Sequence, residues 1–254
     1  MVYPIDNFDT VKDNILRFED IGDFYLVIVL KRKKDKQEIE HDHFGIKHFF
    51  LYQKSDLSKI KSEVESLCLQ NTARAYILPQ RRSTRLVLWS LHDNISDILR
   101  NENFDFKMNH LIRTSVAGMH KTTCKSHKRW VIDIDADDEQ TFKKAVAWRE
   151  SHFNPTSDAF VVREYSSWIA DRIRNALVFR TEKQKEFMPK VSTKYVLEDV
   201  TFLKTPHGFH IVTPPFNREP KAMEKYFGVG CPSTDWIKPD AMALLYAPAI
   251  GEDD

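Results

Sequence analysis

Two aspartates in one apolar segment are the residues of this chain best suited to chemistry. Asp133 and Asp135 follow Val131 and Ile132 in the stretch 130–138. In a β-strand alternate side chains share a face, so the two carboxylates project together. Carboxylates this close repel each other unless a cation lies between them, and Mg²⁺ or Mn²⁺ prefers such oxygen ligands. The pair therefore predicts a Mg²⁺ or Mn²⁺ site, with an acidic surface turn as the alternative.

A second polar group surrounds a predicted turn further along the chain. Lys204 and Thr205 precede the turn at Pro206–Gly208, and His210 follows it inside an apolar segment. We expect a β-hairpin in which Pro presets φ and Gly accepts an unusual backbone, with His207 facing solvent at the tip. The ammonium, hydroxyl, imidazole and turn amides are donors that suit a triphosphate. A hydrogen-bonded core histidine is the alternative for His210.

Strands and helices alternate around these residues. Apolar runs predict strands at 24–30, 44–52, 73–78, 85–91, 130–135, 200–203, 209–213 and 242–247. Helical spacing predicts helices starting near Ser55 and at 95–99, 111–119, 138–152, 167–177 and 221–227, with Asn154–Pro155 as a break. We expect the strand at 85–91 to pair with 73–78 across a turn at 80–84, and Asp137 and Asp138 to begin the helix at 138–152.

Basic residues indicate a polyanionic partner. Arg81 and Arg82 fall in the predicted turn at 80–84, where guanidinium groups can hold nucleic-acid phosphates. The run 107–129, which ends in Lys128 and Arg129, contains Lys and Arg but no Asp or Glu. For both features a solvated charged surface is the alternative. A zinc site is a further alternative, on the following residues: His120, Cys124, His127 and Cys231.

Composition bounds the class of protein. The chain has 254 residues, of which 42% are hydrophobic and 30% charged, so it is long enough and apolar enough for a sizeable core. Its net charge of +1 gives no overall basic field. Three widely spaced cysteines argue against a disulfide framework and for a reducing compartment. Neither a long apolar run nor a signal-peptide core is present, so we expect a cytoplasmic protein with no membrane partner.

The apolar strand ending in Asp133 and Asp135, together with the 204–210 hairpin and a later aspartate, resembles motifs I to III of the archaeo-eukaryotic primase superfamily. The resemblance covers roughly residues 70–250. It implies an α+β fold in which an RRM-like antiparallel sheet forms the catalytic core beside an N-terminal α/β module. We place the N-terminal module at residues 1–105 and the catalytic module at 106–254, with one continuous domain as the alternative.

The resemblance also implies roles for individual residues. Asp133 and Asp135 would bind the metal together with a third carboxylate, for which Asp235 is the first choice and Asp240 the reserve, although no clean apolar strand precedes Asp235. The following residues would bind the incoming nucleotide: Lys204, Thr205, His210 and Lys238. Two metal ions held by about three carboxylates can activate a 3′-hydroxyl and neutralise the leaving pyrophosphate.

The sequence as a whole predicts a DNA primase or primase-polymerase. Such an enzyme would use Mg²⁺ or Mn²⁺ and nucleoside or deoxynucleoside triphosphates on a single-stranded DNA template. The chain length suits a phage or mobile-element protein that works with a separate helicase or other replication proteins. Two alternatives are a metal-dependent nuclease, because Asp, His and Lys also hydrolyse phosphodiesters, and a catalytically inactive nucleic-acid-binding or regulatory protein.

Overall fold

The protein is a mixed α+β structure. The computed structural model describes residues 3–33, 43–100, 128–152, 161–179, 181–188, 199–239 and 241–249. These residues form two antiparallel sheets and seven α-helices. The expected helix at 111–119, the break at Asn154–Pro155, the zinc candidates His120, Cys124 and His127, and Asp240 lie outside the described residues.

The first sheet has the strand order β1-β9-β4-β2-β3. Its strands are β1 (Ile5–Asp6), β2 (Asp23–Arg32), β3 (His43–Leu51), β4 (Arg74–Ser83) and β9 (Ala243–Ala247), and the helices of this part are α1 (Phe8–Asn14), α2 (Lys54–Asn71) and α3 (Thr84–Arg100). The antiparallel pairing of β2 with β3 confirms the expected pair. Helix α2 begins one residue after Gln53, which forms a capping box with Asp56, so the expected start near Ser55 is confirmed.

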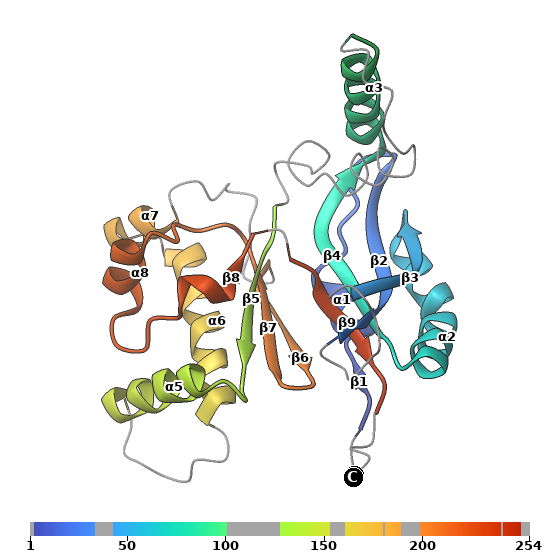
Figure 1. Ribbon diagram of the computed structural model, residues 1–254. Coiled ribbons are helices and arrows are strands. Elements are labelled where there is room, and N and C mark those ends of the chain that lie inside the picture. Colours follow the sequence, from blue (N-terminus) through green and yellow to red (C-terminus); the bar gives the residue numbers. More distant parts are fainter. Residues whose placement is uncertain are drawn as a thin grey trace.

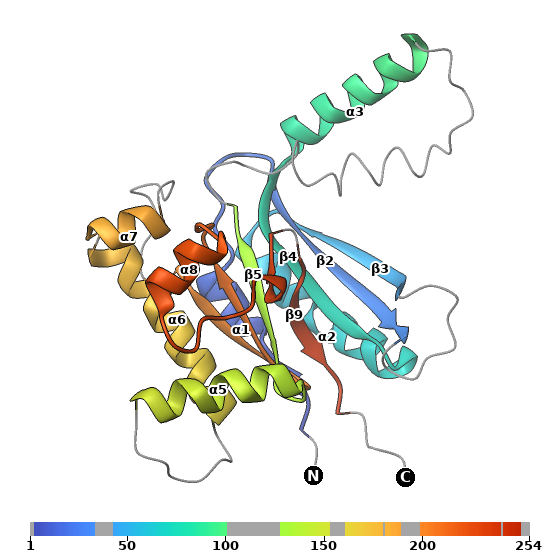
Figure 2. The ribbon, with the colours of Figure 1, turned by 60° about the vertical axis from the view of Figure 1, so that its left-hand side comes forward.

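The second sheet has the order β6-β7-β5-β8. Its strands are β5 (Trp130–Asp135), β6 (Thr201–Thr205), β7 (Gly208–Thr213) and β8 (Ile237–Lys238). Helices α5 (Glu139–His152), α6 (Val161–Phe179) and α7 (Glu182–Phe187) lie between β5 and β6 in sequence, and α8 (Pro220–Phe227) and the 3₁₀ helix η5 (Thr234–Trp236) lie between β7 and β8. Figures 1 and 2 show the two sheets next to each other, with these helices on the outer side of the second sheet.

Two large hydrophobic cores hold the sheets and helices together, and a smaller cluster around Tyr76 and Leu244 lies on the first sheet. One core packs α1 and α2 on the first sheet and also contains Val131, Leu203 and Val212 of the second sheet. The other lies between the second sheet and its helices, around Ile132 and Ile134. Strand β9 comes from the C-terminal part of the chain but pairs with β1 and β4. The two sheets therefore share a hydrophobic core, and the chain returns from the second sheet to the first to form β9. Both features fix the relative position of the sheets.

The expected strand at 85–91 is wrong, because these residues belong to helix α3. The expected turn at 80–84 is wrong for the same reason, since β4 continues to Ser83. Gln80, Arg81 and Arg82 are buried within β4 and do not interrupt the strand. At Thr84 both the backbone N–H and the hydroxyl donate to the carbonyl of Gly22, over 2.9 and 2.8 Å. Helix α3 starts there and projects away from the sheets (Figures 1 and 2).

None of the helices in the described part of the chain is both long enough and apolar enough to cross a membrane.

Candidate functional site

Strand β5 carries the predicted carboxylates. The side chains of Ile132 and Ile134 are fully buried against the helices of the second sheet, so alternation places Asp133 and Asp135 on the opposite face. That face is directed toward the first sheet. The side chain of Asp133 is 40% exposed, and Asp135 at the strand end is exposed. Asp138 accepts the Thr141 N–H over 2.8 Å at the start of α5, which confirms its expected place at the helix N-terminus.

The predicted hairpin brings His210 directly opposite Asp133. Strands β6 and β7 pair with Thr205 opposite Gly208, and β7 pairs with β5 so that His210 faces Asp133. His210 Nδ1 accepts the backbone N–H of Leu244 over 3.0 Å. Because Nδ1 is the acceptor, Nε2 carries the proton in the neutral imidazole, and it lies 3.2 Å from Asp133 Oδ1. The fold therefore fixes both the orientation and the tautomer of His210.

Lys238 completes the surroundings of Asp133. Its Nζ donates to Asp133 Oδ2 over 2.9 Å from the neighbouring strand β8. Burial by itself raises the pKa of the Asp133 carboxyl, but the hydrogen bond from His210 and the ammonium of Lys238 outweigh it and hold this pKa well below its usual range. Asp133 is therefore ionised at neutral pH, as a metal ligand must be.

The hairpin turn lies against the end of β5. The Ala136 N–H donates to the His207 carbonyl, and His207 Nδ1 lies 2.7 Å from Asp137 Oδ2. His207 is exposed, as expected for the turn tip. The expected reason for Gly208 is wrong, because it is not among the described glycines with positive φ. A Cβ at Gly208 would instead lie 2.0 Å from the Ile134 carbonyl oxygen, so glycine is needed for the close approach of the two strands.

The first sheet supplies the other wall of the site. Arg32 at the end of β2 and Arg74 at the start of β4 face the carboxylates of β5 across a pocket of about 260 Å³. Arg32 Nη1 donates to the Tyr76 hydroxyl over 2.9 Å. The lining residues are Arg32, Arg74, Tyr76, Asp133, Asp135, Asp137, Thr205, Pro206, His207, His210 and Leu244. Sequence reasoning missed both arginines, since nothing local indicates that β2 and β4 end opposite β5.

Two other predicted residues are not brought to this pocket. Lys204 lies opposite Phe209 in the hairpin, one position out of phase with His210, so its side chain projects from the other face. Asp235 is exposed on η5. Among the described residues, the lining of the pocket includes neither of them. The pocket thus joins Asp133, Asp135, Thr205 and His210, while Lys204 and Asp235 lie outside it. Lys238 is not part of the lining and is connected to the pocket through its hydrogen bond to Asp133.

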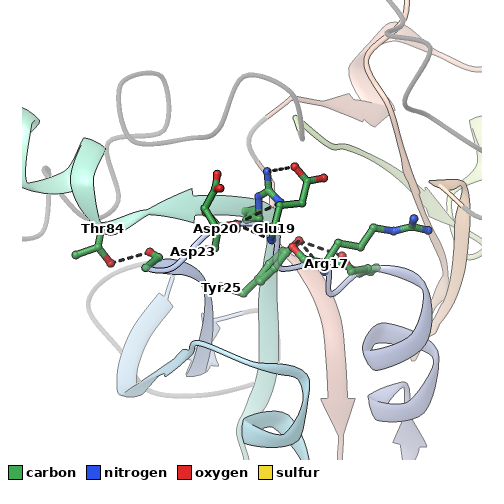
Figure 3. Close-up of polar contacts among 9 residues, drawn as sticks. Arg17, Glu19, Asp20, Asp23, Tyr25 and Thr84 are labelled. Atoms are coloured by element: carbon green, nitrogen blue, oxygen red, sulfur yellow. Dashed lines mark hydrogen bonds and ion pairs between the residues drawn. The ribbon is translucent and has the colours of Figure 1, made fainter.

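Arg81 and Arg82 lie inside the protein and not in an exposed turn. Their relative exposures are 1% and 0%. Arg81 is 3.3 Å from Asp23 Oδ2 and 3.1 Å from Glu19 Oε2. Figure 3 shows the loop around these contacts, in which Asp23 also accepts the N–H groups of Glu19 and Asp20. The observed place of Arg81 is that of a structural ion pair, so the expected pair of exposed guanidinium groups is wrong.

Arg129 is likewise buried, and it anchors the start of β5. Its Nη2 is 2.7 Å from Asp199 Oδ1, and both side chains are 3% exposed. The Arg129 carbonyl accepts Gln80 Nε2 over 3.1 Å, and the same amide nitrogen donates to the Pro239 carbonyl over 2.7 Å. These contacts tie β4 of the first sheet to one end of the β5–β8 pair, where Arg129 precedes β5 and Pro239 follows β8. Lys128, the residue before Arg129, is half-buried.

The carboxylates present suit one hard cation. Within the described ranges, no three His, Cys, Asp or Glu side chains are grouped so that they could hold a metal ion. Mg²⁺ is commonly held by one or two carboxylates together with substrate phosphates and water. Asp133 and Asp135 match that donor set, whereas two ions would need a further carboxylate. A cation bound to Asp133 would lie close to the Lys238 ammonium, whose charge repels it, so cation binding favours displacement of Lys238 from the carboxylate.

Comparison with known proteins gives no match, whether to a family model, to a curated protein or to a solved structure.

Proposed function

We propose that this chain is a template-directed nucleotidyltransferase, a primase or primase-polymerase that uses Mg²⁺ or Mn²⁺ and nucleoside triphosphates on single-stranded DNA. One observation carries the proposal. A single pocket is lined by Asp133 and Asp135 of β5 and by Arg32 and Arg74 of the first sheet. A metal-chelated polyphosphate is the kind of ligand that needs both, because its cation binds carboxylates and its phosphate oxygens bind arginine.

The topology of the second sheet supports the fold part of this proposal. The chain runs β5, helices, β6, β7, helix, β8, and the spatial order is β6-β7-β5-β8. This is the β-α-β-β-α-β arrangement with four antiparallel strands that RRM-like and ferredoxin-like domains share. Asp133 lies on the first strand of this sheet and His210 on the third, so the residues that the resemblance assigns to motifs I and II of archaeo-eukaryotic primases face each other on paired strands.

Each side chain then has a role toward the nucleotide. Arg32, Arg74 and the Thr205 hydroxyl donate to phosphate oxygens, and the Nε2–H of His210 donates to the same group from its fixed position beside Asp133. Lys238, released from Asp133, offsets charge that develops on the leaving pyrophosphate. A bound divalent cation supplies Lewis-acid activation of the phosphorus centre and of the attacking 3′-hydroxyl. The pocket is smaller than the about 300–1,000 Å³ of typical ligand sites, so it suits the triphosphate and leaves the base outside.

The test is synthesis on a single-stranded DNA template with Mn²⁺ or Mg²⁺ and labelled nucleotides. We expect primer extension or de novo dinucleotides from the wild type and at least a hundredfold loss in Asp133→Asn. Asp13→Asn is the matched control, since Asp13 is an exposed aspartate on α1. Shortening of the template in place of synthesis would overturn the proposal in favour of a metal-dependent nuclease.

A second candidate, a catalytically inactive nucleic-acid-binding protein, is favoured by one observation. Both carboxylate oxygens of Asp133 are already engaged, by His210 and by Lys238. If the Lys238 ammonium takes the place of the cation, the protein keeps its fold but has no metal ion for nucleotidyl transfer. Unchanged single-strand affinity in Asp133→Ala, combined with no synthesis by the wild type under any metal, would establish this candidate.

A further inference from the structure

We infer that Asn7 is a positioning residue for His210, and thereby for the candidate site; its effect on catalysis rests on the proposed function. Asn7 precedes α1 at the N-terminus of the chain and is 5% exposed. Its side chain lies where the two sheets meet and is hydrogen-bonded to both. No motif marks it in the sequence, because its partners are backbone groups more than 190 residues away, at separations of 197 and 237.

The Asn7 amide connects one strand of each sheet. Its Nδ2 donates to the carbonyl of Lys204 on β6 over 2.9 Å and to the carbonyl of Leu244 on β9 over 3.1 Å. An asparagine amide has two N–H donors, and here each sheet receives one. The backbone N–H of Asn7 donates to the Leu245 carbonyl over 3.0 Å, which fixes the residue itself to β9. The Asn7 side chain is therefore a second link between the hairpin and β9, beside the direct hydrogen bond from the Leu244 N–H to His210 Nδ1.

Leu244 connects Asn7 to the imidazole of His210. Its carbonyl accepts from Asn7, and its N–H donates to His210 Nδ1 over 3.0 Å. The peptide groups of β9 hold the two bonds in fixed relation, so a shift of Leu244 alters the donor that selects the Nε2–H tautomer. That tautomer is the one that points a proton at Asp133, 3.2 Å away. Partners that orient a functional imidazole from behind set its tautomer and basicity.

Helix α1 does not use the side-chain amide of Asn7. Asparagine at the N-cap position commonly accepts a backbone N–H from the first turn of its helix, yet Asn7 makes no such bond to α1. Asp6 accepts the Phe8 N–H instead, over 2.9 Å. The Asn7 amide is thus directed away from the helix that it precedes and toward the strands behind His210. Aspartate at this position would set a carboxylate against two carbonyl oxygens.

The test combines an NMR readout with kinetics on Asn7→Ala. In ¹⁵N-histidine-labelled protein without ligand, we expect the wild type to show His210 as a single Nε2–H tautomer. Asn7→Ala should show a mixture of tautomers, with a fall in kcat/KM for nucleotide addition of about 10–100-fold, the range seen when such supporting partners are removed. Asn7→Ser, which keeps a single donor, should give a smaller change in both readouts and replaces Asn7→Ala if that variant does not fold.

Asn71→Ala is the matched control, because the Asn71 amide also donates to a backbone carbonyl, that of the partly buried Leu67, over 2.9 Å. It should leave the His210 signals unchanged. An unchanged His210 tautomer in a folded Asn7 variant would overturn the inference and make Asn7 a purely structural link. The NMR readout does not depend on synthesis, so an inactive wild type would count against the proposed function while the positioning role is still decided.

Discussion

Replacing Gly208 with alanine should separate the hairpin from β5. The new Cβ would lie 2.0 Å from the Ile134 carbonyl oxygen and 2.9 Å from the Ala136 nitrogen, both backbone atoms. Carbon and oxygen rarely approach closer than about 3.3 Å, so the strands must move apart by about 1.3 Å. Overpacking of this kind costs about 1–3 kcal/mol. The same movement displaces Thr205 and His210 from Asp133.

Urea unfolding at neutral pH measures the effect. With a denaturant slope of about 2 kcal/mol/M, a loss of about 2 kcal/mol lowers the midpoint by about 1 M. Gly45→Ala is the matched control, since Gly45 also lies in a strand and its added Cβ would meet its nearest neighbour at an ordinary 3.6 Å. A Gly208→Ala midpoint equal to that of Gly45→Ala would refute the close approach of the hairpin and β5.

Three further outcomes follow from the same contacts. Arg81→Met should lower the free energy of unfolding by about 3–5 kcal/mol, because it removes the guanidinium that pairs with the buried carboxylate of Asp23. Lys47→Met, which removes an exposed ion pair with Glu63, should lower it by under about 1 kcal/mol. Because the pKa of Asp133 is lower in the folded than in the unfolded protein, its ionised form stabilises the fold above about pH 4, and this contribution is lost as pH falls. Urea unfolding should therefore show a smaller loss of stability between pH 6 and pH 3 for Asp133→Asn than for the wild type. Asp235→Asn should keep synthesis near the wild-type rate in the primer assay, and a loss as large as that of Asp133→Asn would place Asp235 among the metal ligands.

The strands that carry the site could be predicted because their signals are local. The β-rich run of β2, the apolar residues before Asp133 and the turn residues between β6 and β7 are each contained within a few positions. The C-terminal part of helix α3 was predicted at 95–99. Its first half was not, since an apolar run as short as 85–91 fits a strand or a helix equally well. The polar stretch at its start was mistaken for a turn, because the carboxylates that pair with Arg81 come from a distant loop.

The sequence predicted the residues that the second sheet contributes to the site but not those of the first sheet. Asp133 and His210 face each other because adjacent strands of a single sheet pair them, and the spacing of the motif reflects that pairing. Arg32 and Arg74 join them through the packing of one sheet beside the other, which no short pattern encodes. Lys204 was expected in the pocket from its place before the turn, yet strand alternation directs it away.

Calorimetric titration with a non-hydrolysable nucleoside triphosphate, with and without Mn²⁺, tests most directly whether the two walls form one nucleotide site. We predict that Mn²⁺ tightens binding at least tenfold in the wild type. Asp133→Asn should remove this dependence on the metal, and Arg74→Gln should weaken binding whether or not metal is present. Absence of nucleotide binding, or binding that neither substitution alters, would contradict a shared cation and polyphosphate pocket.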